Sequence, residues 1–449
     1  MDDIRAWLAE APHAAGDYVA DAALFRRFWQ RGDALRRRLP EKPQRGAGEV
    51  EEAASILAAL REARERFCAA HAVTLYRALT DDCTRFLRIE ALVEAAAVAL
   101  PGLVPAKEAL ARDGTLAQRD KDGAEIDHGI FLASVLADPG TGAHLCHAML
   151  LPRPDSAARA EDFWRTGTLD LGAALLERRG KAVQVTMRNP RYLNAEDEGT
   201  IDELETAIDV ATLDPSSAIA VLRGGPVEHQ KWRGRRVFSA GINLTHLYQG
   251  KISFLWYLRR DLGLVNKLFR GVARPDRSPD ELQGGTIEKP WLAAVDGFAI
   301  GGGCQILLVM DYVIAASDAY LTLPARKEGI IPGAANLRLP RFTGDRIARQ
   351  AILSGRRIDC AAREGRLICD EVVAPDAMDT AIDRAVADFT GSGVVSAAGN
   401  RRALRVGMEP LDLFRRYMAV YAREQAYCHF SPALIDNLER NWNAASRRA

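Results

Sequence analysis

The first third of the chain has the apolar spacing of helices. In residues 51–79, five apolar positions recur at roughly helical intervals, and Ala, Arg and Glu, which favour helices, fill the positions between them. The pattern continues through residues 84–100 and stops at Pro101 and Gly102, which are typical of a helix end. Because no strand alternation occurs here, we predict an all-helical N-terminal domain over residues 1–165. The five apolar positions are Ile56, Leu57, Leu60, Phe67 and Leu75.

Beyond the helical region the pattern changes to short β-branched runs that end in turn residues. Residues 181–190 and 217–225 have this character, and residues 205–214 between them have helical period. Residues 290–300 form a third strand candidate. Strands that alternate with helices predict a parallel sheet covered on both faces, so we expect an α/β core over residues 166–375.

The last part of the chain is again helical in pattern. Ser431 and Pro432 supply an N-cap followed by proline at the first helical position. We therefore predict a C-terminal helical region over residues 376–449. One insert, residues 270–290, is polar and rich in Pro and Gly, which predicts a surface loop.

The composition is that of an ordinary globular protein without an excess of charge. The 449 residues include 60 Lys and Arg and 60 Asp and Glu, so the formal net charge is zero. This removes the global electrostatic argument for nucleic acid or an anionic membrane as a partner. The seven cysteines are scattered without a CxxC pair, which disfavours a zinc cage or a disulfide framework. His144 and His147 lie three residues apart, but no third ligand is near in sequence, so packing is favoured over metal binding.

The first residues, MDDIRAWLAEAPHAAG, are acidic and lack the basic and apolar regions of a signal peptide. No stretch reaches the roughly 18 uninterrupted apolar residues of a membrane span. We therefore expect a cytoplasmic protein.

Two glycine-containing turns carry the clearest chemical signal. The run Gly301–Gly303 follows a strand candidate and precedes an apparent helix, whose first N–H groups have no partner inside the helix. Without Cβ atoms in this run, a ligand oxygen can approach those N–H groups closely. Residues 237–244 have the same character around Gly241. The pattern suits a phosphate or a developing oxyanion, but it matches neither GxGxxG nor GxxxxGK[ST].

Four motifs occur in a fixed order along the chain. They are RNPRYLNA (188–195), FSAGINL (238–244), VDGFAIGGGCQILLVMDYVIAAS (295–317) and GIIPGAANLRLPRFTG (329–344). In order and spacing they resemble the crotonase (enoyl-CoA hydratase/isomerase) superfamily. The resemblance covers roughly residues 175–400 and implies a crotonase-like ββα spiral core that binds acyl-CoA thioesters. It also implies that the C-terminal helices assemble trimers, which usually pair into hexamers.

The resemblance implies a site for the thioester oxygen. The backbone N–H groups of Ile242 and Gly302 would form an oxyanion hole, with Gly241 and Gly303 beside them. An acyl-CoA enolate would form there.

The adenine and phosphates of CoA usually lie near the first of these motifs in this superfamily. Arg188 and Arg191 are therefore expected substrate contacts, although solvated surface arginines fit the sequence equally well. The basic segment 231–236 is either an exposed loop or a further attraction for the CoA phosphates.

Two carboxylates that hydratase-type crotonases use are replaced in this chain. The position after the glycine triplet and its cysteine holds Gln305, and the position eight residues before Gly333 holds Ala325. Neither an amide nor a methyl group transfers protons at neutral pH, so hydration of an enoyl-CoA is disfavoured. Glu328 lies nearby in sequence, but its register does not match the role.

These departures, together with the long helical N-terminal region, resemble one branch of the superfamily, the cofactor-independent dioxygenases that act on 3,5-dihydroxyphenylacetyl-CoA in antibiotic precursor synthesis. That branch has glutamine at the position of Gln305 and an arginine on the helix after the first glycine turn. Arg260 is the favoured match, with Arg259 as the alternative. Glu196 is either a further polar residue of the pocket or a carboxylate at a helix start.

The resemblance implies an oxidation of an arylacetyl-CoA by O2 without metal or flavin, giving 3,5-dihydroxyphenylglyoxylate and CoA. The N-terminal helices and the apolar residues Phe254, Leu255 and Trp256 are expected to close the pocket against water. Two alternatives stay open at this point. One is another crotonase-type reaction, such as thioester hydrolysis or decarboxylation, and the other is a non-catalytic acyl-CoA-binding subunit.

Overall fold

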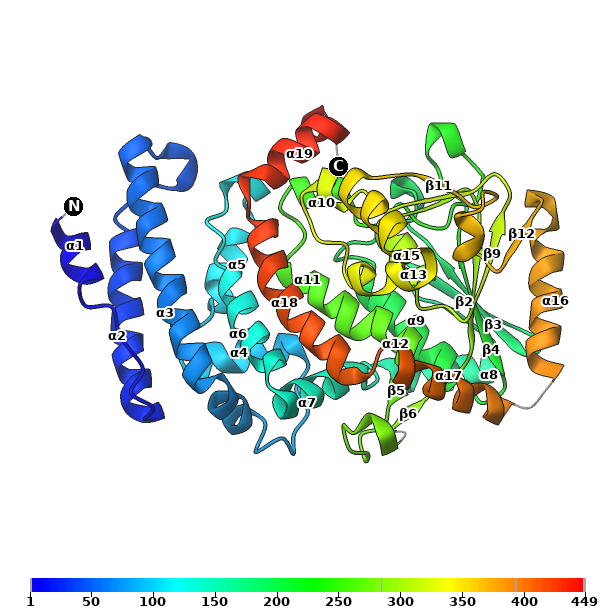
Figure 1. Ribbon diagram of the computed structural model, residues 1–449, viewed down its shortest axis with the longest axis horizontal. Helices are drawn as coiled ribbons and strands as arrows, with labels where there is room; N and C mark the ends of the chain where they lie inside the picture. Colours follow the sequence, from blue (N-terminus) through cyan, green and yellow to red (C-terminus); the bar gives the residue numbers. More distant parts are fainter. Residues whose placement is uncertain (1, 284, 392–393, 447–449) are drawn as a thin grey trace. The chain divides into compact units, whose positions relative to one another are not determined.

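The computed structural model describes residues 2–283, 285–391 and 394–446 (Figure 1). They group into two compact units, each built from separate stretches of the chain. The helical unit comprises Met1–Met149, Tyr248–Leu255 and Phe414–Asp436, and the sheet unit comprises Leu150–Leu247, Trp256–Leu413 and Asn437–Ala449. The division of the chain after residues 165 and 375 remains a prediction of the sequence.

The helical unit is built around the long helix α3 (Ala47–Leu79), against which α2 (Tyr18–Arg36) and α6 (Ile126–Ala137) pack. Four of the five apolar positions predicted for α3 are buried because they share one face of the helix. Phe67 meets Phe25 and Trp29 of α2 with T-shaped ring contacts. The four buried positions are Ile56, Leu60, Phe67 and Leu75.

Most of the C-terminal helix α18 (Leu411–His429) belongs to the helical unit. Gln118 Nε2 donates a hydrogen bond of 2.7 Å to the main-chain oxygen of His429. Gly129 lies so close to this helix that a Cβ there would stand 2.5 Å from Ala426 Cβ. One face of this predicted oligomerisation helix therefore packs on its own chain.

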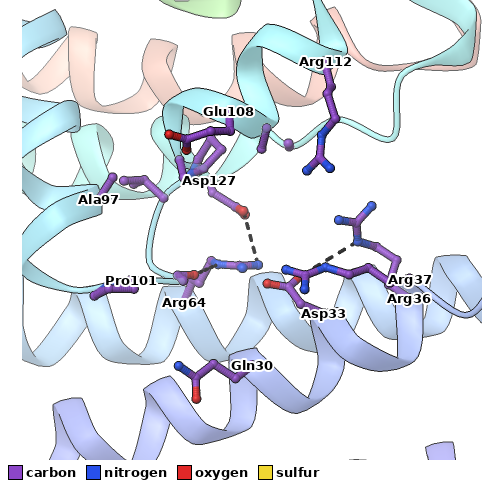
Figure 2. A pocket seen from close by; sticks show the side chains of 16 residues that line it. Gln30, Asp33, Arg36, Arg37, Arg64, Ala97, Pro101, Glu108, Arg112 and Asp127 are labelled. Carbon is purple, nitrogen blue, oxygen red and sulfur yellow. Dashed lines mark hydrogen bonds and ion pairs between the residues drawn. The ribbon is translucent and has the colours of Figure 1, made fainter.

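The helical unit contains a cavity of about 550 Å³ with a charged lining (Figure 2). Arg64 pairs with Asp127 at 3.3 Å, and Arg36 pairs with Asp33 at 3.8 Å. Burial raises the pKa of Asp127 to about 6. The Arg64–Asp127 pair joins α3 to α6, so these charges serve the packing of the helical unit.

The sheet unit is built on seven strands. Their order is β1 (Thr168–Asp170), β2 (Ala174–Arg179), β3 (Ala182–Met187), β4 (Ile219–Gly224), β7 (Trp291–Val295), β9 (Tyr312–Ala316) and β12 (Glu371–Val373). The first three pair antiparallel, and the strands from β3 to β12 pair in parallel. Every residue of β3, β4 and β7 is buried, as a parallel sheet with two covered faces requires.

Helices cover this sheet. The helix α9 (Ile201–Leu213) packs against β2 and β3, and α16 (Met378–Gly391) packs against β4 and β9 (Figure 1). The predicted α/β core with a helical N-terminal region and C-terminal helices is confirmed. The other helices are α1 (Asp2–Leu8), α4 (Ile89–Ala99), α5 (Lys107–Asp113), α7 (Pro139–Leu150), α8 (Ser156–Thr166), α10 (Leu244–Tyr248), α11 (Phe254–Arg259), α12 (Val265–Arg270), α13 (Gly302–Leu307), α14 (Ala325–Glu328), α15 (Ala335–Ser354), α17 (Val394–Met408) and α19 (Pro432–Trp442).

A second, smaller sheet positions the glycine triplet. Its order is β11 (Ile358–Asp359), β10 (Tyr320–Thr322) and β8 (Phe298–Ile300), and β8 leads directly into the triplet. The segment 290–300, predicted as one strand, therefore forms two strands in different sheets. The chain turns between them at Gly297, which has a φ of 66°.

The insert 270–290 is only partly the surface loop that its composition predicts. Val272 and Ala273 form β5, are buried, and pair with β6 (Thr286–Ile287). The side chain of Arg270 is buried as well. Apolar residues at the start of the insert explain the difference, because they join the core before the polar part begins.

A buried carboxylate gathers three arginines near the end of α17. Glu409 accepts hydrogen bonds from Arg338 at 2.8 and 3.0 Å and from Arg341 at 2.9 Å, and it lies 3.5 Å from Arg270. Burial alone would favour the neutral acid, but Arg338, followed by Arg270 and Arg341, lowers the pKa of Glu409 to about 2. The carboxylate therefore holds α12 and α15 to the segment after α17.

Glu409→Gln is expected to lower the free energy of unfolding at pH 7 by about 3 kcal/mol, because it leaves buried arginines without their counter-charge. The folded-state pKa lies below the ordinary value of 4.5, so the difference from wild type is full above pH 4.5 and shrinks as the pH falls toward 2. Urea unfolding across this range measures it. The exposed Glu161→Gln on α8 is the control. Equal stability of both variants would contradict the interpretation.

Candidate active site

The two glycine turns lie in direct contact where β8 ends. The segment before Gly241 runs alongside β8, and the Ile300 N–H donates to the Ser239 oxygen at 2.9 Å. Gly241 has a φ of 77°. A Cβ on Gly241 would lie 2.6 Å from the Ile300 oxygen and 2.8 Å from the Gly302 nitrogen. The close approach of the two turns therefore requires glycine at position 241.

Two backbone N–H groups at this contact have no hydrogen-bond acceptor in the part of the chain that the structure describes. Gly302 begins α13, and the first N–H groups of a helix have no acceptor within it. Ile242 lies opposite Glu196 in a parallel bridge that uses the Gly241 oxygen and the Asn243 N–H, which leaves the Ile242 N–H unused. Two such donors can stabilise one oxygen atom that gains negative charge.

Arg260 connects three of the predicted site residues. Its guanidinium donates to both carboxylate oxygens of Glu196, at 2.5 and 3.0 Å. It also donates to Gln305 Oε1 at 2.8 Å and to the Gly302 oxygen at 2.8 Å. Arg260 and Glu196 are each 2% exposed. This cluster, Arg260 with Glu196 and Gln305, is thus buried and hydrogen-bonded to the glycine triplet.

The local backbone selects Arg260 over the alternative Arg259. Arg260 begins a π-helical turn, Arg260–Leu264, between α11 and α12. Turns of this kind often occur at functional sites. Arg259 instead pairs with Glu198 at 2.9 Å and with Asp202.

Two further glycines pack closely around the first turn of α13. A Cβ on Gly303 would lie 2.9 Å from Ser239 Cβ, so this residue also keeps the two turns together. A Cβ on Gly333, the glycine of the IPG motif, would lie 2.5 Å from Gln305 Oε1 and 2.7 Å from Asp261 Oδ2. The IPG segment therefore contacts the amide of Gln305 directly.

A cavity of about 530 Å³ in the sheet unit reaches the first glycine turn and is lined in part by Ile242. Arg191, one of the two predicted CoA contacts, also lines it. The other, Arg188, pairs with Asp170 of β1 instead. The structure thus brings Arg191, but not Arg188, to the cavity beside Ile242.

Glu328, whose register does not match a family position, lines the same cavity. It is the last residue of α14 and shares the buried face of that helix with Ala325. Burial raises the pKa of its carboxyl group to about 7. The signal available in the sequence was the spacing of three residues from Ala325, which places both side chains on one face of a helix.

The histidine pair of the helical unit is packed against an aromatic ring. The rings of His144 and His147 lie 4.6 and 4.9 Å from that of Phe86, centroid to centroid. Among the described residues, no group of three or more His, Cys, Asp or Glu side chains is arranged to hold a metal ion.

Comparison with known proteins places this geometry in a family. A family model described as enoyl-CoA hydratase/isomerase matches residues 276–396. A (3,5-dihydroxyphenyl)acetyl-CoA 1,2-dioxygenase from Amycolatopsis orientalis is 48% identical over 398 residues, which is 88% of this chain and 90% of that protein. The chain belongs to the crotonase superfamily. The resemblance predicted from the four motifs is confirmed, including its closeness to this dioxygenase.

Other crotonases match a smaller share of the chain. A short-chain-enoyl-CoA hydratase from Clostridium acetobutylicum is 29% identical over 245 residues, covering 54% of this chain and 84% of that protein. The crystal structure of an enoyl-CoA hydratase from Bacillus halodurans has a TM-score of 0.50 at 19% identity, covering 60% of this chain and all of that one. The crotonase fold is therefore shared, and about two fifths of this chain lies outside the structural match.

In this crotonase, the positions expected to carry the two hydratase carboxylates offer no proton-transfer group. Gln305 accepts a hydrogen bond from Arg260 through its amide oxygen. Ala325 is a buried methyl group. Buried acids near the glycine turns include Glu196 and Asp261, which both pair with Arg260, and Glu328 in the cavity.

Gly241→Ala in this crotonase is expected to lower the free energy of unfolding by about 2 kcal/mol more than Gly180→Ala, because its Cβ meets backbone atoms of the other turn. Gly180 is a matched control, since its φ of 58° imposes similar strain but a Cβ there meets nothing within 4 Å. Urea unfolding of both variants measures the difference. Equal losses would show that the turns are not in contact.

Proposed function

We propose that the chain is a metal- and cofactor-independent dioxygenase that converts 3,5-dihydroxyphenylacetyl-CoA and O2 to 3,5-dihydroxyphenylglyoxylate and CoA. The observation that carries this proposal is the 48% identity over 88% of the chain to an enzyme of that name. The identity confirms the expected class of enzyme, a dioxygenase acting on an acyl-CoA. The buried cluster of Arg260, Glu196 and Gln305 supports the finer assignment of the substrate.

The reaction begins with an enolate. The Cα–H of an arylacetyl thioester is acidic because the resulting charge spreads over the aryl ring and the thioester. The N–H groups of Ile242 and Gly302 bind the thioester oxygen as that charge develops. Loss of one such donor typically costs about 3–4 kcal/mol of transition-state stabilisation.

The buried cluster binds the dihydroxyphenyl ring. Glu196 can accept and Arg260 can donate hydrogen bonds to ring hydroxyls, and the amide of Gln305 can do both. Arg260 pairs with Asp261 as well as with Glu196, so a neutral residue at position 305 avoids a third carboxyl group beside this one guanidinium. These residues orient the ring and do not transfer protons.

The enolate then reacts with O2. The enolate passes an electron to O2, and recombination forms a bond between Cα and oxygen. The peroxide attacks the thioester carbonyl and expels CoA, and cleavage of the O–O bond with loss of the second Cα proton gives the α-keto acid. The balance is one thioester and one O2 consumed for one glyoxylate, one CoA thiol and one proton. Exclusion of water from the pocket would protect the enolate from protonation.

Three further expectations belong to this proposal. Arg191 contacts CoA, a role that its place on the cavity supports. Self-association as a trimer or hexamer is supported by exposed apolar side chains of α17, among them Leu404 at 62% and Val406 at 48% exposure. We expect the enzyme to be cytoplasmic and to take part in antibiotic precursor synthesis. Within the described residues, no helix has the length and apolar character needed to cross a bilayer.

Thiol release from 3,5-dihydroxyphenylacetyl-CoA is expected to require O2, with one O2 consumed for each CoA released. An oxygen electrode and a thiol reagent, used on the same sample with and without O2, measure both quantities. Release at the same rate without O2 would indicate hydrolysis instead. Binding of the thioester without any release would indicate a non-catalytic subunit.

Gln305→Glu is expected to lower the rate of O2 uptake at least tenfold, which corresponds to about 1.4 kcal/mol in the barrier. A carboxylate at this position competes with Glu196 for Arg260 and adds negative charge beside the developing enolate. Initial rates of O2 uptake at saturating thioester measure the effect. The control is Gln44→Glu, an exposed site in the helical unit. Unchanged turnover of Gln305→Glu would contradict the need for a neutral side chain.

A further inference from the structure

A carboxyl group lines the cavity beside Ile242. Its lining includes Ala240 and Ile242 of the first glycine turn and Ile300, which directly precedes the triplet. Glu328 is the one Asp or Glu among the described residues that line it. A thioester bound to the N–H groups of Ile242 and Gly302 therefore has this carboxyl group in the same cavity.

The backbone fixes where this carboxylate points. In the one-turn helix α14, Ala325 and Glu328 are buried, whereas Arg326 and Lys327 between them are exposed. The Glu328 N–H donates to the Pro324 oxygen at 3.1 Å, and the left-handed residue Gly329 ends the helix directly afterwards. Glu328 thus lies one helical turn beyond position 325, on the face that the hydratase carboxylate would occupy.

The carboxyl group of Glu328 has no hydrogen-bond or ion-pair partner among the residues that the structure describes. Burial is accordingly the sole cause of its pKa of about 7. The titratable groups that share the cavity with it are Arg191, Tyr192 and His229. On its own helix, Arg326 donates to the Leu353 oxygen.

Other buried acids near the glycine turns, such as Glu196 and Asp261, are differently placed. Both carboxylate oxygens of Glu196 accept hydrogen bonds from Arg260, and Asp261 pairs with the same guanidinium at 3.4 Å. Accepting a proton would break this bidentate pair inside the protein, where an unpaired guanidinium is costly. Of these acids, Glu328 is the one without an arginine partner, so its oxygens are available to accept a proton.

We propose that Glu328 is the general base that removes the Cα proton of the bound thioester. The Cα–H bond breaks, an O–H bond forms on the Glu328 carboxylate, and the electron pair passes to the thioester oxygen held by Ile242 and Gly302. The carboxylate is regenerated when this proton leaves with CoA as its thiol. The inference rests on the proposed function for its substrate and identifies the base that this function needs.

The test uses full-length enzyme and 3,5-dihydroxyphenylacetyl-CoA. Glu328→Gln is expected to slow O2-dependent thiol release by about a hundredfold or more, the usual contribution of a general base. The kcat/KM of wild type is expected to decrease as the pH is lowered below about 7, and Glu328→Gln is expected to lose this pH dependence. Glu328→Asp is expected to retain the pH dependence at a reduced rate. The control is Glu228→Gln, an exposed residue next to His229 on the cavity lining.

A second measurement separates this proposal from the proposed function. Without O2, wild type in D2O is expected to exchange the Cα hydrogens of the thioester, and Glu328→Gln is expected to do so at least a hundredfold more slowly. Burial favours the neutral form of Glu328, and glutamine is a neutral side chain of the same shape, so Glu328→Gln is expected to fold. An unchanged affinity for the thioester would confirm that the variant is folded.

Each outcome decides one of the two claims. If wild type consumes O2 and Glu328→Gln keeps the rate, the exchange and the pH profile, the base assignment is overturned and the dioxygenase stands. If wild type exchanges Cα hydrogens through Glu328 but consumes no O2, the dioxygenase is overturned and the base stands. Absence of both activities in wild type would overturn both.

Discussion

The contact between two backbone turns is the constraint on which the site depends. The segment ending at Gly241 pairs alongside β8, so both chains reach the site in a fixed register. With the Gly302 nitrogen only 2.8 Å from where a Cβ of residue 241 would stand, no side chain fits between them. The two unused N–H groups follow from this backbone geometry. Their position is set by the main chain and not by the side chains around them.

The buried cluster is hydrogen-bonded to one of these two turns. Arg260 donates to the Gly302 oxygen as well as to Glu196 and Gln305, so the groups that would bind the ring also hold the turn that would bind the thioester. One guanidinium and two carboxyl groups, those of Glu196 and Asp261, are buried together here. A further carboxylate at position 305 would add charge that Arg260 does not compensate, in a site with little access to water. The neutrality of Gln305 therefore has a physical reason that its place after the glycines does not reveal.

The elements that could be predicted are those with long, regular patterns. The face of α3 and the buried strands β3, β4 and β7 repeat one period over enough residues to be recognised, and the glycine turns are marked by composition. The strand predicted over 290–300 was wrong because a single turn at Gly297 sends its second half to another sheet. Strands of two or three residues, such as β11 and β8, depend on partners distant in sequence. The π-helical turn at Arg260 likewise has no periodic pattern in the amino-acid sequence by which it could be predicted.

Glu328 lies on the buried face of the short helix that also holds Ala325. The position eight residues before Gly333 of the IPG motif holds Ala325, so the carboxylate expected there is missing. Because residues 325 to 328 form a helical turn, Glu328 lies on the same face of the helix as Ala325. Here Glu196 and Asp261 pair with Arg260, and Glu328 lies without such a partner in a cavity lined by Ile242 and Ile300. On the proposed function, this arrangement forms the enolate and withholds the water that would quench it, so that the next molecule to reach the carbanion is O2.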